Sequence, residues 1–225
     1  MDKFKKGLKW FFESFIWLGA LMLAIDIITK NVVINNSQAI LSGGGKHGGV
    51  DLIPGFLGIN YTINPNIAFG MSLGSPLANR IVFSVFALLI VTGLIIYMAF
   101  KWGKINKFYK ATFMLIIAGA LGNVTDRIFY SAEYLHYSAG GELISGVVDW
   151  IDFYGIWQFN FNIADSCVVV AAFMLIIYMI IEEIIDYRKR AKLLENEPQD
   201  NEKVLSQTEQ EKNRLLEEGK EEDNE

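Results

Sequence analysis

The sequence predicts an α-helical membrane protein with four transmembrane helices and a small extracytoplasmic β-sheet formed by its outer loops. The composition is the first indication, because 52% of the 225 residues are hydrophobic and 16 are Phe, more than an ordinary soluble domain carries. The second is that four mainly apolar stretches approach the ~20 residues that a membrane helix needs. The third is that the segments between them contain short runs of the kind that form strands.

The predicted spans differ in how many charged residues they contain. The first includes Glu13 and Asp26, whereas the second has no charge at all. The third is short and contains the small-residue run AGALGN, which favours close packing against a neighbouring helix. The four predicted spans are residues 10–29, 81–100, 111–126 and 163–181.

Basic residues predict the orientation of these spans, because cytoplasmic loops of membrane proteins are enriched in Lys and Arg. If both termini are cytoplasmic, three basic clusters fall on the cytoplasmic side and only Lys30, Lys46, Arg80 and Arg127 fall on the other. The clusters are Lys3, Lys5, Lys6 and Lys9; Lys101, Lys104, Lys107 and Lys110; and Arg188, Lys189, Arg190 and Lys192. We therefore expect a multi-pass protein with both ends in the cytoplasm.

The charges also divide the chain into parts. Residues 186–225 hold 13 acidic and 8 basic residues, which accounts for the whole net charge of −5. We expect this tail to be disordered or loosely helical, because it is polar and has few large apolar residues. The expected parts are a basic cytoplasmic N-terminus (1–9), a four-span membrane domain (10–185, with outer loops 31–80 and 127–162) and the charged cytoplasmic tail (186–225).

Several kinds of site are excluded or weakly supported. A single cysteine, Cys167, excludes an internal disulfide, and with only His47 and His136 no motif at metal-ligand spacing is present. We expect no cofactor, no metal and no nucleic-acid partner. The first apolar run is too long for a cleavable signal and is predicted to be a retained anchor.

The outer loops contain the strand-like runs. Residues 157–162 alternate apolar and polar side chains, and residues 56–63 and 147–154 are β-branched and aromatic. Their aromatic residues also suit anchoring at the membrane interface. The Gly-rich segment 42–49 lacks the ending of a phosphate-binding loop and is predicted to be a flexible connector.

Aspartates gather at the outer ends of the predicted spans. On the predicted topology, Asp26, Asp126 and Asp165 lie near the outer surface on three helices, and Asp149 lies in the last outer loop. A charge within a membrane helix costs at least ~2.5–3.5 kcal/mol at the helix centre, which favours a functional role. Asp165 also suits a capping pair with Asn162 at a helix start, and both interpretations stay open.

The two aspartates nearest to helix C-termini need a different explanation, because the helix dipole disfavours negative charge there. Each has a basic residue nearby: Lys30 lies four residues after Asp26, and Arg127 follows Asp126. These pairs are predicted to be structural.

The residues favour acid–base chemistry over a nucleophilic side chain. Neither histidine lies in a motif that marks a catalytic triad, and Cys167 is predicted to pack as a small apolar residue. Two carboxyl groups in a site of low polarity share one proton, so that one activates water and the other polarises a carbonyl. A proton- or ion-coupled transporter and a non-catalytic membrane scaffold are the alternatives.

Five blocks of sequence resemble those of the bacterial lipoprotein signal peptidases (signal peptidase II), in the same order. These are DIITK (26–30), NPNIAF (64–69), GNVTDR (122–127), VVDW (147–150) and FNIADS (161–166). The resemblance covers roughly residues 15–185. It implies a membrane-embedded aspartic endopeptidase of the bacterial cytoplasmic membrane, which cuts the signal peptide from diacylglyceryl-modified prolipoproteins near the outer surface.

Matching positions imply the roles of individual residues. The catalytic pair would be Asp149 and Asp165. The residues lining the site would be Asn64, Asn123, Asp126, Arg127 and Asn162, and Asp26 and Lys30 would be a structural pair beneath it.

Two positions leave alternatives open. Asn66 stands where the family usually has Gly, and Asp152, three residues after Asp149, would replace it after a shift in register. We expect a monomer whose partners are membrane lipid and the prolipoprotein substrate.

Overall fold

The computed structural model describes residues 2–45, 47–65, 74–130, 136–137, 143–144, 146–154 and 159–222. In this part of the chain, four helices are long and apolar enough to cross a membrane: Ile16–Asn35, Leu77–Lys101, Lys107–Phe129 and Ile163–Leu193. The prediction of four transmembrane helices is therefore confirmed. Asn66 lies outside the described residues.

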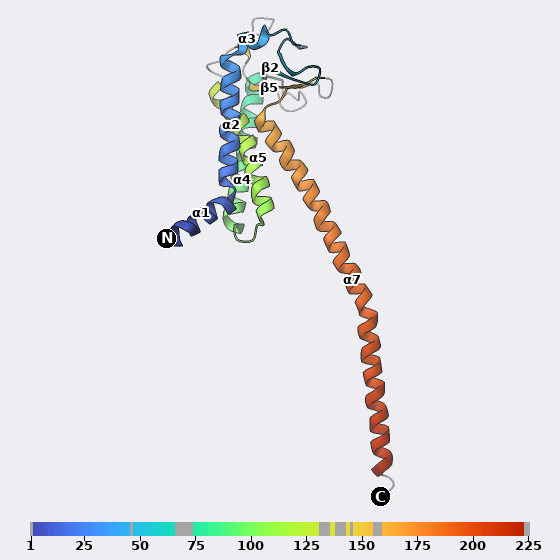
Figure 1. Cartoon of the computed structure of the whole chain (residues 1–225). Coiled ribbons are helices and arrows are strands. Elements are labelled where there is room, and N and C mark those ends of the chain that lie inside the picture. The colour runs from blue at the N-terminus through green and yellow to red at the C-terminus, as the bar shows by residue number, and fades with distance from the viewer. Residues whose placement is uncertain are drawn as a thin grey trace. The chain divides into compact units, whose positions relative to one another are not determined.

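The chain forms two compact units, Met1–Leu175 and Ile176–Glu225, and the long last helix contributes to both. Beyond Leu175 that helix continues through the charged tail to Glu222. The helices in Figure 1 are α1 (Asp2–Ser14), α2 (Ile16–Asn35), α3 (Ser37–Leu41), α4 (Pro76–Lys101), α5 (Lys107–Thr125), the π-helical η2 (Asp126–Tyr130) and α7 (Ile163–Glu222).

The start of the first span differs from the prediction. The sequence places it at residue 10, but residues 2–14 form the separate helix α1 and the spanning helix α2 begins at Ile16. Phe15 between them has a left-handed backbone (φ 58°), which interrupts the helix. Glu13 consequently lies outside the span. A run of apolar side chains does not by itself reveal such a break.

Local sequence explains how the next two helices begin. The Ser75 side chain accepts a hydrogen bond from the backbone N–H of Ala78 (3.1 Å) and caps α4, where Pro76 occupies the first turn. Asn106 caps α5 in the same way through the N–H of Tyr109 (2.9 Å).

Small residues of α5 allow three helices to meet, as the run AGALGN predicts. A Cβ atom on Gly119 would lie 2.5 Å from the Ala164 carbonyl oxygen of α7, and one on Gly122 would lie 2.5 Å from Oδ2 of Asp26 on α2. Neither position has room for a side chain. The close approach brings Asp26 of α2, Asp126 at the start of η2 and Asp165 of α7 towards one level.

A small antiparallel sheet lies at this end of the helices (Figure 1). Its strands, in the order β1-β2-β5, are Val50–Ile53, Leu57–Asn64 and Val147–Phe153. Two short strands, β3 (His136–Tyr137) and β4 (Leu143–Ile144), form a separate pair. The prediction of a small sheet is confirmed, with strands at two of the three expected segments.

The prediction of a third strand, at residues 157–162, is wrong for the residues of this segment that the structure describes. Of residues 157–162, the described residues 159–162 contribute only an isolated bridge, between Phe161 and Ile151. Backbone hydrogen bonds still join these two residues in both directions (2.8 and 3.1 Å), and α7 begins immediately afterwards at Ile163. The start of the helix at Ile163 ends the alternating segment before it can form a longer strand.

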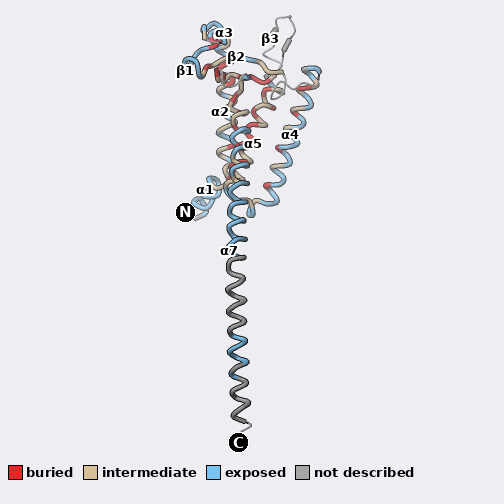
Figure 2. Tube along the Cα trace, turned by 90° about the vertical axis from the view of Figure 1, so that its right-hand side faces the viewer, coloured by how far each residue is buried: buried red, intermediate tan, exposed pale blue. Residues whose placement is uncertain are grey.

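The sheet rests on the ends of α2 and α3. Val33 and Ile34 of α2 and Ile40 of α3 form a buried cluster with Tyr61 of β2 and Val148 of β5. Figure 2 shows buried residues around the sheet and the adjoining parts of α2 and α5, whereas much of α4 is exposed. Exposed apolar side chains on a spanning helix are suited to contact with lipid. The core therefore fixes the sheet against the helix ends that carry the aspartates.

Candidate active site

A buried ion cluster joins α2 to the end of α5. The Lys30 ammonium lies 2.7 Å from Oδ2 of Asp26, one turn earlier on α2, and 2.9 Å from Oδ2 of Asp126 at the start of η2. None of the three side chains is more than 1% exposed. The expected pair Asp26–Lys30 is present. Lys30 is also bonded to Asp126, whose neighbouring cation in the sequence is Arg127.

The same two carboxylates hold the backbone next to Asp149 and Asp165. Asp26 Oδ1 accepts a hydrogen bond from the N–H of Ala164 (2.8 Å), and Asp126 Oδ2 accepts one from the N–H of Val148 (3.0 Å). Each acceptor thus holds the residue immediately before one of the two candidate catalytic aspartates. The ion cluster fixes the start of α7 and strand β5 relative to each other.

Asn162 contacts both candidate catalytic carboxyl groups. Its side-chain oxygen accepts the N–H of Asp165 (2.9 Å), while the Asp165 carboxyl accepts the N–H of Asn162 (3.3 Å), a reciprocal cap at the start of α7. The Asn162 amide nitrogen also donates to Oδ1 of Asp149 (2.8 Å). The capping interpretation of Asp165 is therefore correct, and the capping residue is also the link to Asp149.

Two further amides complete this network. Asn64 of β2 donates to Oδ2 of Asp149 (3.0 Å), and Asn123 of α5 donates to Oδ1 of Asp165 (2.7 Å). The Asn123 oxygen accepts from Lys30 (3.2 Å), which connects the network to the ion cluster. The Arg127 guanidinium donates to the backbone carbonyl oxygen of Asn123 (3.3 Å). All nine residues predicted for the site or its supporting pair are brought together.

Asp149 lies in an environment that disfavours its charge. Its side chain belongs to the buried part of β5, with 3% of its surface exposed. Burial, with a further contribution from the negative charge of Asp165, raises the pKa of Asp149 to about 8. Burial and the neighbouring charge therefore favour the protonated form of the Asp149 carboxyl group, which is linked through Asn162 to a second carboxyl group.

The chain matches the family model described as signal peptidase (SPase) II over residues 18–181. The chain belongs to this family. It is accordingly a peptidase and an integral protein of the bacterial cell membrane, so neither the transporter nor the scaffold alternative holds.

Curated relatives are similar over most of their length. A lipoprotein signal peptidase of Desulfitobacterium hafniense (strain DSM 10664 / DCB-2) is 35% identical over 169 residues, which cover 75% of this chain and 94% of the relative. One of Chlorobium phaeobacteroides (strain BS1) is 31% identical over 172 residues, covering 74% and 95%. The similarity thus extends over the spans and the sheet.

Solved structures support the fold of this signal peptidase II family member. A bacterial membrane enzyme determined by the in meso method at 2.3 Å resolution matches with a TM-score of 0.56 and 25% identity, covering 75% of this chain and 88% of the other. A second, at 1.9 Å resolution, matches with a TM-score of 0.53 and 26% identity, covering 73% and 90%. The helices and the sheet therefore form an arrangement known from experiment.

Asp152, the alternative to Asp149 in this signal peptidase II family member, lies in different surroundings. Residues three apart in a strand point to opposite faces, and Oδ2 of Asp152 contacts Nδ1 of His47 (2.8 Å), a residue that the sequence placed in a flexible connector. Tyr154 packs edge-on against the His47 ring, with the ring centroids 5.0 Å apart. Asp152 thus ties the Gly-rich segment to β5.

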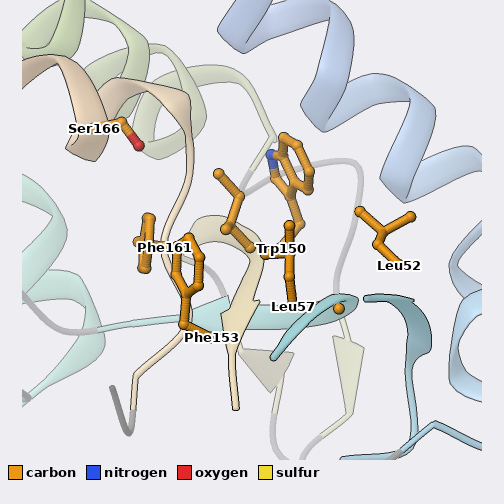
Figure 3. A pocket seen from close by; sticks show the side chains of 8 residues that line it. Leu52, Leu57, Trp150, Phe153, Phe161 and Ser166 are labelled. Atoms are coloured by element: carbon orange, nitrogen blue, oxygen red, sulfur yellow. The ribbon is translucent and has the colours of Figure 1, made fainter. Parts of the chain in front are cut away.

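An apolar pocket of about 310 Å³ lies on the sheet next to the start of α7. Figure 3 shows the aromatic side chains of Trp150, Phe153 and Phe161 around it, with Ser166 at its edge. Leu52 and Leu57 complete much of the lining. Ser166 is the residue after Asp165, so the pocket reaches the first turn of α7.

Proposed function

We propose that this chain removes the signal peptide from diacylglyceryl-modified prolipoproteins, with Asp149 and Asp165 as the catalytic residues of an aspartic endopeptidase. The observation that carries this proposal is that Asn162 bonds both carboxyl groups, to Asp149 through its side-chain nitrogen and to Asp165 through its backbone N–H. One small residue can contact both only if they lie close together.

The surroundings of the two carboxyl groups support different roles. Asp165 is the third residue of α7, where the positive end of the helix dipole favours the ionised form. Asp149 is buried on β5, and its raised pKa of about 8 favours the protonated form. We therefore assign Asp165 as the base that activates water and Asp149 as the acid that polarises the scissile carbonyl.

This assignment gives a balanced hydrolysis. Asp165 accepts a proton from water as the water oxygen bonds to the carbonyl carbon, and Asp149 donates its proton to the carbonyl oxygen. The tetrahedral intermediate then collapses: its C–N bond breaks, Asp165 returns a proton to the leaving nitrogen, and a hydroxyl proton returns to Asp149. At the end of the cycle Asp149 is protonated and Asp165 is ionised again, as at the start. The two side chains therefore act as a true acid and base catalyst pair.

The position of the site suits a lipid-bearing substrate. Asp165 begins a helix long and apolar enough to cross the membrane, so the reaction would occur near the edge of the hydrocarbon. A diacylglyceryl group anchored in the bilayer would hold the scissile bond, just before the modified cysteine, at that depth. The apolar pocket beside Ser166 suits an apolar side chain of the substrate.

The proposal includes the arrangement in the membrane. The basic residues support cytoplasmic termini and an active site near the outer surface. Residues 1–9 and 186–225 would then be the cytoplasmic ends of a membrane domain formed by residues 10–185, and we propose that one copy of the chain is active as a monomer. Chemical cross-linking at a protein concentration that still gives activity tests whether the active form is a monomer. A dimer that persists at that concentration would contradict the proposal.

The decisive experiment incubates purified protein in lipid with a diacylglyceryl-modified prolipoprotein and, separately, with its unmodified form. We expect cleavage of the modified form alone, and no cleavage by Asp165→Asn. Chelators and serine- or cysteine-directed reagents should leave the rate unchanged. Cleavage of both substrates would contradict the lipid requirement, and full activity of Asp165→Asn would contradict the dyad.

A further inference from the structure

Helix α1 has an apolar side that the rest of the described chain leaves exposed. Phe4, Leu8, Phe11 and Phe12 recur at intervals of three and four residues, which places them on one side of the helix. They are between 41% and 75% exposed, and α1 is correspondingly pale blue in Figure 2. Four exposed large apolar side chains on a short helix are more than a surface in water usually carries.

The other side of α1 is basic. At 100° per residue, Lys3, Lys6 and Lys9 fall opposite the apolar side, and Lys5 falls at the boundary. Long lysine side chains at such a boundary can extend their ammonium groups towards water while their methylene groups cover apolar surface. Glu13 and Trp10 also fall on the basic side, so the helix is apolar on one side and polar, with a net positive charge, on the other.

The junction with α2 directs α1 away from the axis of the spanning helix. Phe15 adopts a left-handed backbone, which is unfavourable for a bulky side chain. The bend is nevertheless well bonded: Ser14 Oγ accepts the N–H of Ile16 (3.2 Å), and the Trp17 indole donates to the Phe12 carbonyl (3.2 Å). Figure 1 shows α1 leaving the end of α2 at an angle.

Contacts place α1 beside the turn between α4 and α5. Glu13 pairs with Lys107 at the start of α5 (3.0 Å), and the Trp10 and Trp102 rings lie 6.0 Å apart. The Lys110 ammonium lies 4.4 Å above the Trp102 ring. This end of α2 and α5 is opposite to the aspartates and is the one where the sequence concentrates lysine. Tryptophan is enriched at membrane–water interfaces.

We propose that α1 lies in the plane of this membrane interface and binds anionic phospholipid headgroups. The apolar side would enter the boundary between headgroups and acyl chains to a depth of ~5–10 Å, and the lysines would face the phosphates. A bilayer necessarily lies beside α1, because the chain enters a membrane span at Ile16. Charge complementarity favours anionic lipid over a protein partner, and the inference does not depend on the proposed chemistry.

The test uses the full chain in bilayer discs, whose two faces have the same lipid composition. In a Cys167→Ala background, a nitroxide label is placed at Leu8→Cys on the apolar side or, as a matched control, at Lys6→Cys on the basic side. Discs contain phosphatidylcholine alone or with about a third phosphatidylglycerol. Access of each label to a water-soluble nickel chelate and to oxygen is measured, and cleavage of the prolipoprotein confirms folding.

We expect phosphatidylglycerol to lower nickel access at the Leu8 label at least about fivefold, since one lysine near an anionic surface shifts the docking equilibrium by about that factor. The label at residue 6 should stay accessible to nickel in both lipids. The combined variant Lys3→Gln, Lys5→Gln and Lys9→Gln should remove the effect of phosphatidylglycerol on the Leu8 label. Equal nickel access at both labels in both lipids would overturn the proposal. So would shielding of Leu8 regardless of lipid charge, or spin–spin broadening that disappears on dilution with unlabelled protein, which would identify a second copy as the occupant.

Discussion

The ion cluster and the amide network each contain two aspartates, but the aspartates of the two groups are bonded to different partners. Asp26 and Asp126 are bonded to the ammonium of Lys30, with N–O distances of 2.7 and 2.9 Å. Asp149 and Asp165 are bonded to the uncharged amides of Asn64, Asn123 and Asn162. The ion cluster is fully buried, whereas the amide network combines the buried Asp149 and Asn162 with partly buried residues. Asn123 bonds to both groups.

The difference in partner explains a difference in function. A buried carboxylate with an ammonium partner has its charge compensated and serves as a structural acceptor, as Asp26 and Asp126 do for the backbone of Ala164 and Val148. Neutral amides orient a carboxyl group but compensate its charge less. Asp149 can therefore hold a proton near neutral pH. Compensation by a cation gives rigidity, and weaker compensation permits proton transfer.

The largest expected effect concerns the amide network. Asp149→Asn or Asp165→Asn should each lower kcat by about 10⁴-fold, at the upper end of what positioned acids and bases contribute. Asparagine has nearly the same shape and keeps a side-chain oxygen as acceptor, so the fold should persist. Initial cleavage rates at saturating prolipoprotein, with helix content checked by circular dichroism, measure this. Loss of fold in both variants would assign these residues to the structural group instead.

The next effect concerns the ion cluster. Lys30→Met should lower the free energy of unfolding by about 3–5 kcal/mol, because removal of one partner leaves buried carboxylates uncompensated. Denaturation in mild detergent measures this. The matched control is Lys189→Met, which removes an exposed pair with Asp186 and should change stability little.

A combined variant makes the same comparison sharper. Lys30→Met with Asp26→Asn and Asp126→Asn removes all the charge of the cluster, so stability should recover in part. No recovery would show that Lys30 acts through its shape or its bond to Asn123 rather than through its charge.

The third effect is the pH dependence of stability that Asp149 contributes. Its pKa is raised from 3.8 to about 8 in the folded protein, so between these values the folded state binds a proton that the unfolded state has lost. The free energy of unfolding should therefore fall as pH rises through this interval and level off above it. Asp149→Asn, compared with wild type by chemical denaturation at several pH values, should lack this component.

The pH dependence of the cleavage rate should also report the ionisation of Asp149. If Asp149 acts as the acid, the rate should fall at alkaline pH as it ionises, giving one side of a bell-shaped profile that belongs to the coupled pair. A rate that is still rising above pH 9 would mean that Asp149 acts in its ionised form.

How much of this was predictable depended on the distance between the residues along the chain. The pairing of Asp26 with Lys30 follows from helix geometry, and the cap of Asp165 by Asn162 follows from spacing at a helix start. The contact of Lys30 with Asp126, nearly a hundred residues later, requires the close approach of α2 and α5. Arg127 was the candidate that its position next to Asp126 in the sequence suggested.

The same limit explains the errors in the secondary structure. Hydropathy could not distinguish α1 from α2, because the break depends on the backbone of Phe15 rather than on polarity. Alternation at 157–162 resembled a strand, but the described part is taken up by one bridge and the cap of α7. Apolar length and local pairs could be predicted, whereas boundaries set by tertiary contacts could not.

The smallest expected effect comes from the third kind of aspartate, Asp152. It is buried and contacts the half-exposed imidazole of His47, outside the amide network around Asp149. Asp152→Asn keeps an acceptor for that ring, so kcat/KM should stay within about twofold of wild type, because this contact lies outside the groups that carry the chemistry. His47→Ala is the matched variant, because it removes the same contact from the other side. If Asp152→Asn were inactive while Asp149→Asn cleaved normally, the register of β5 at the active site would be shifted by three residues, and the contrast between amide-bonded and cation-bonded aspartates would lose its catalytic meaning.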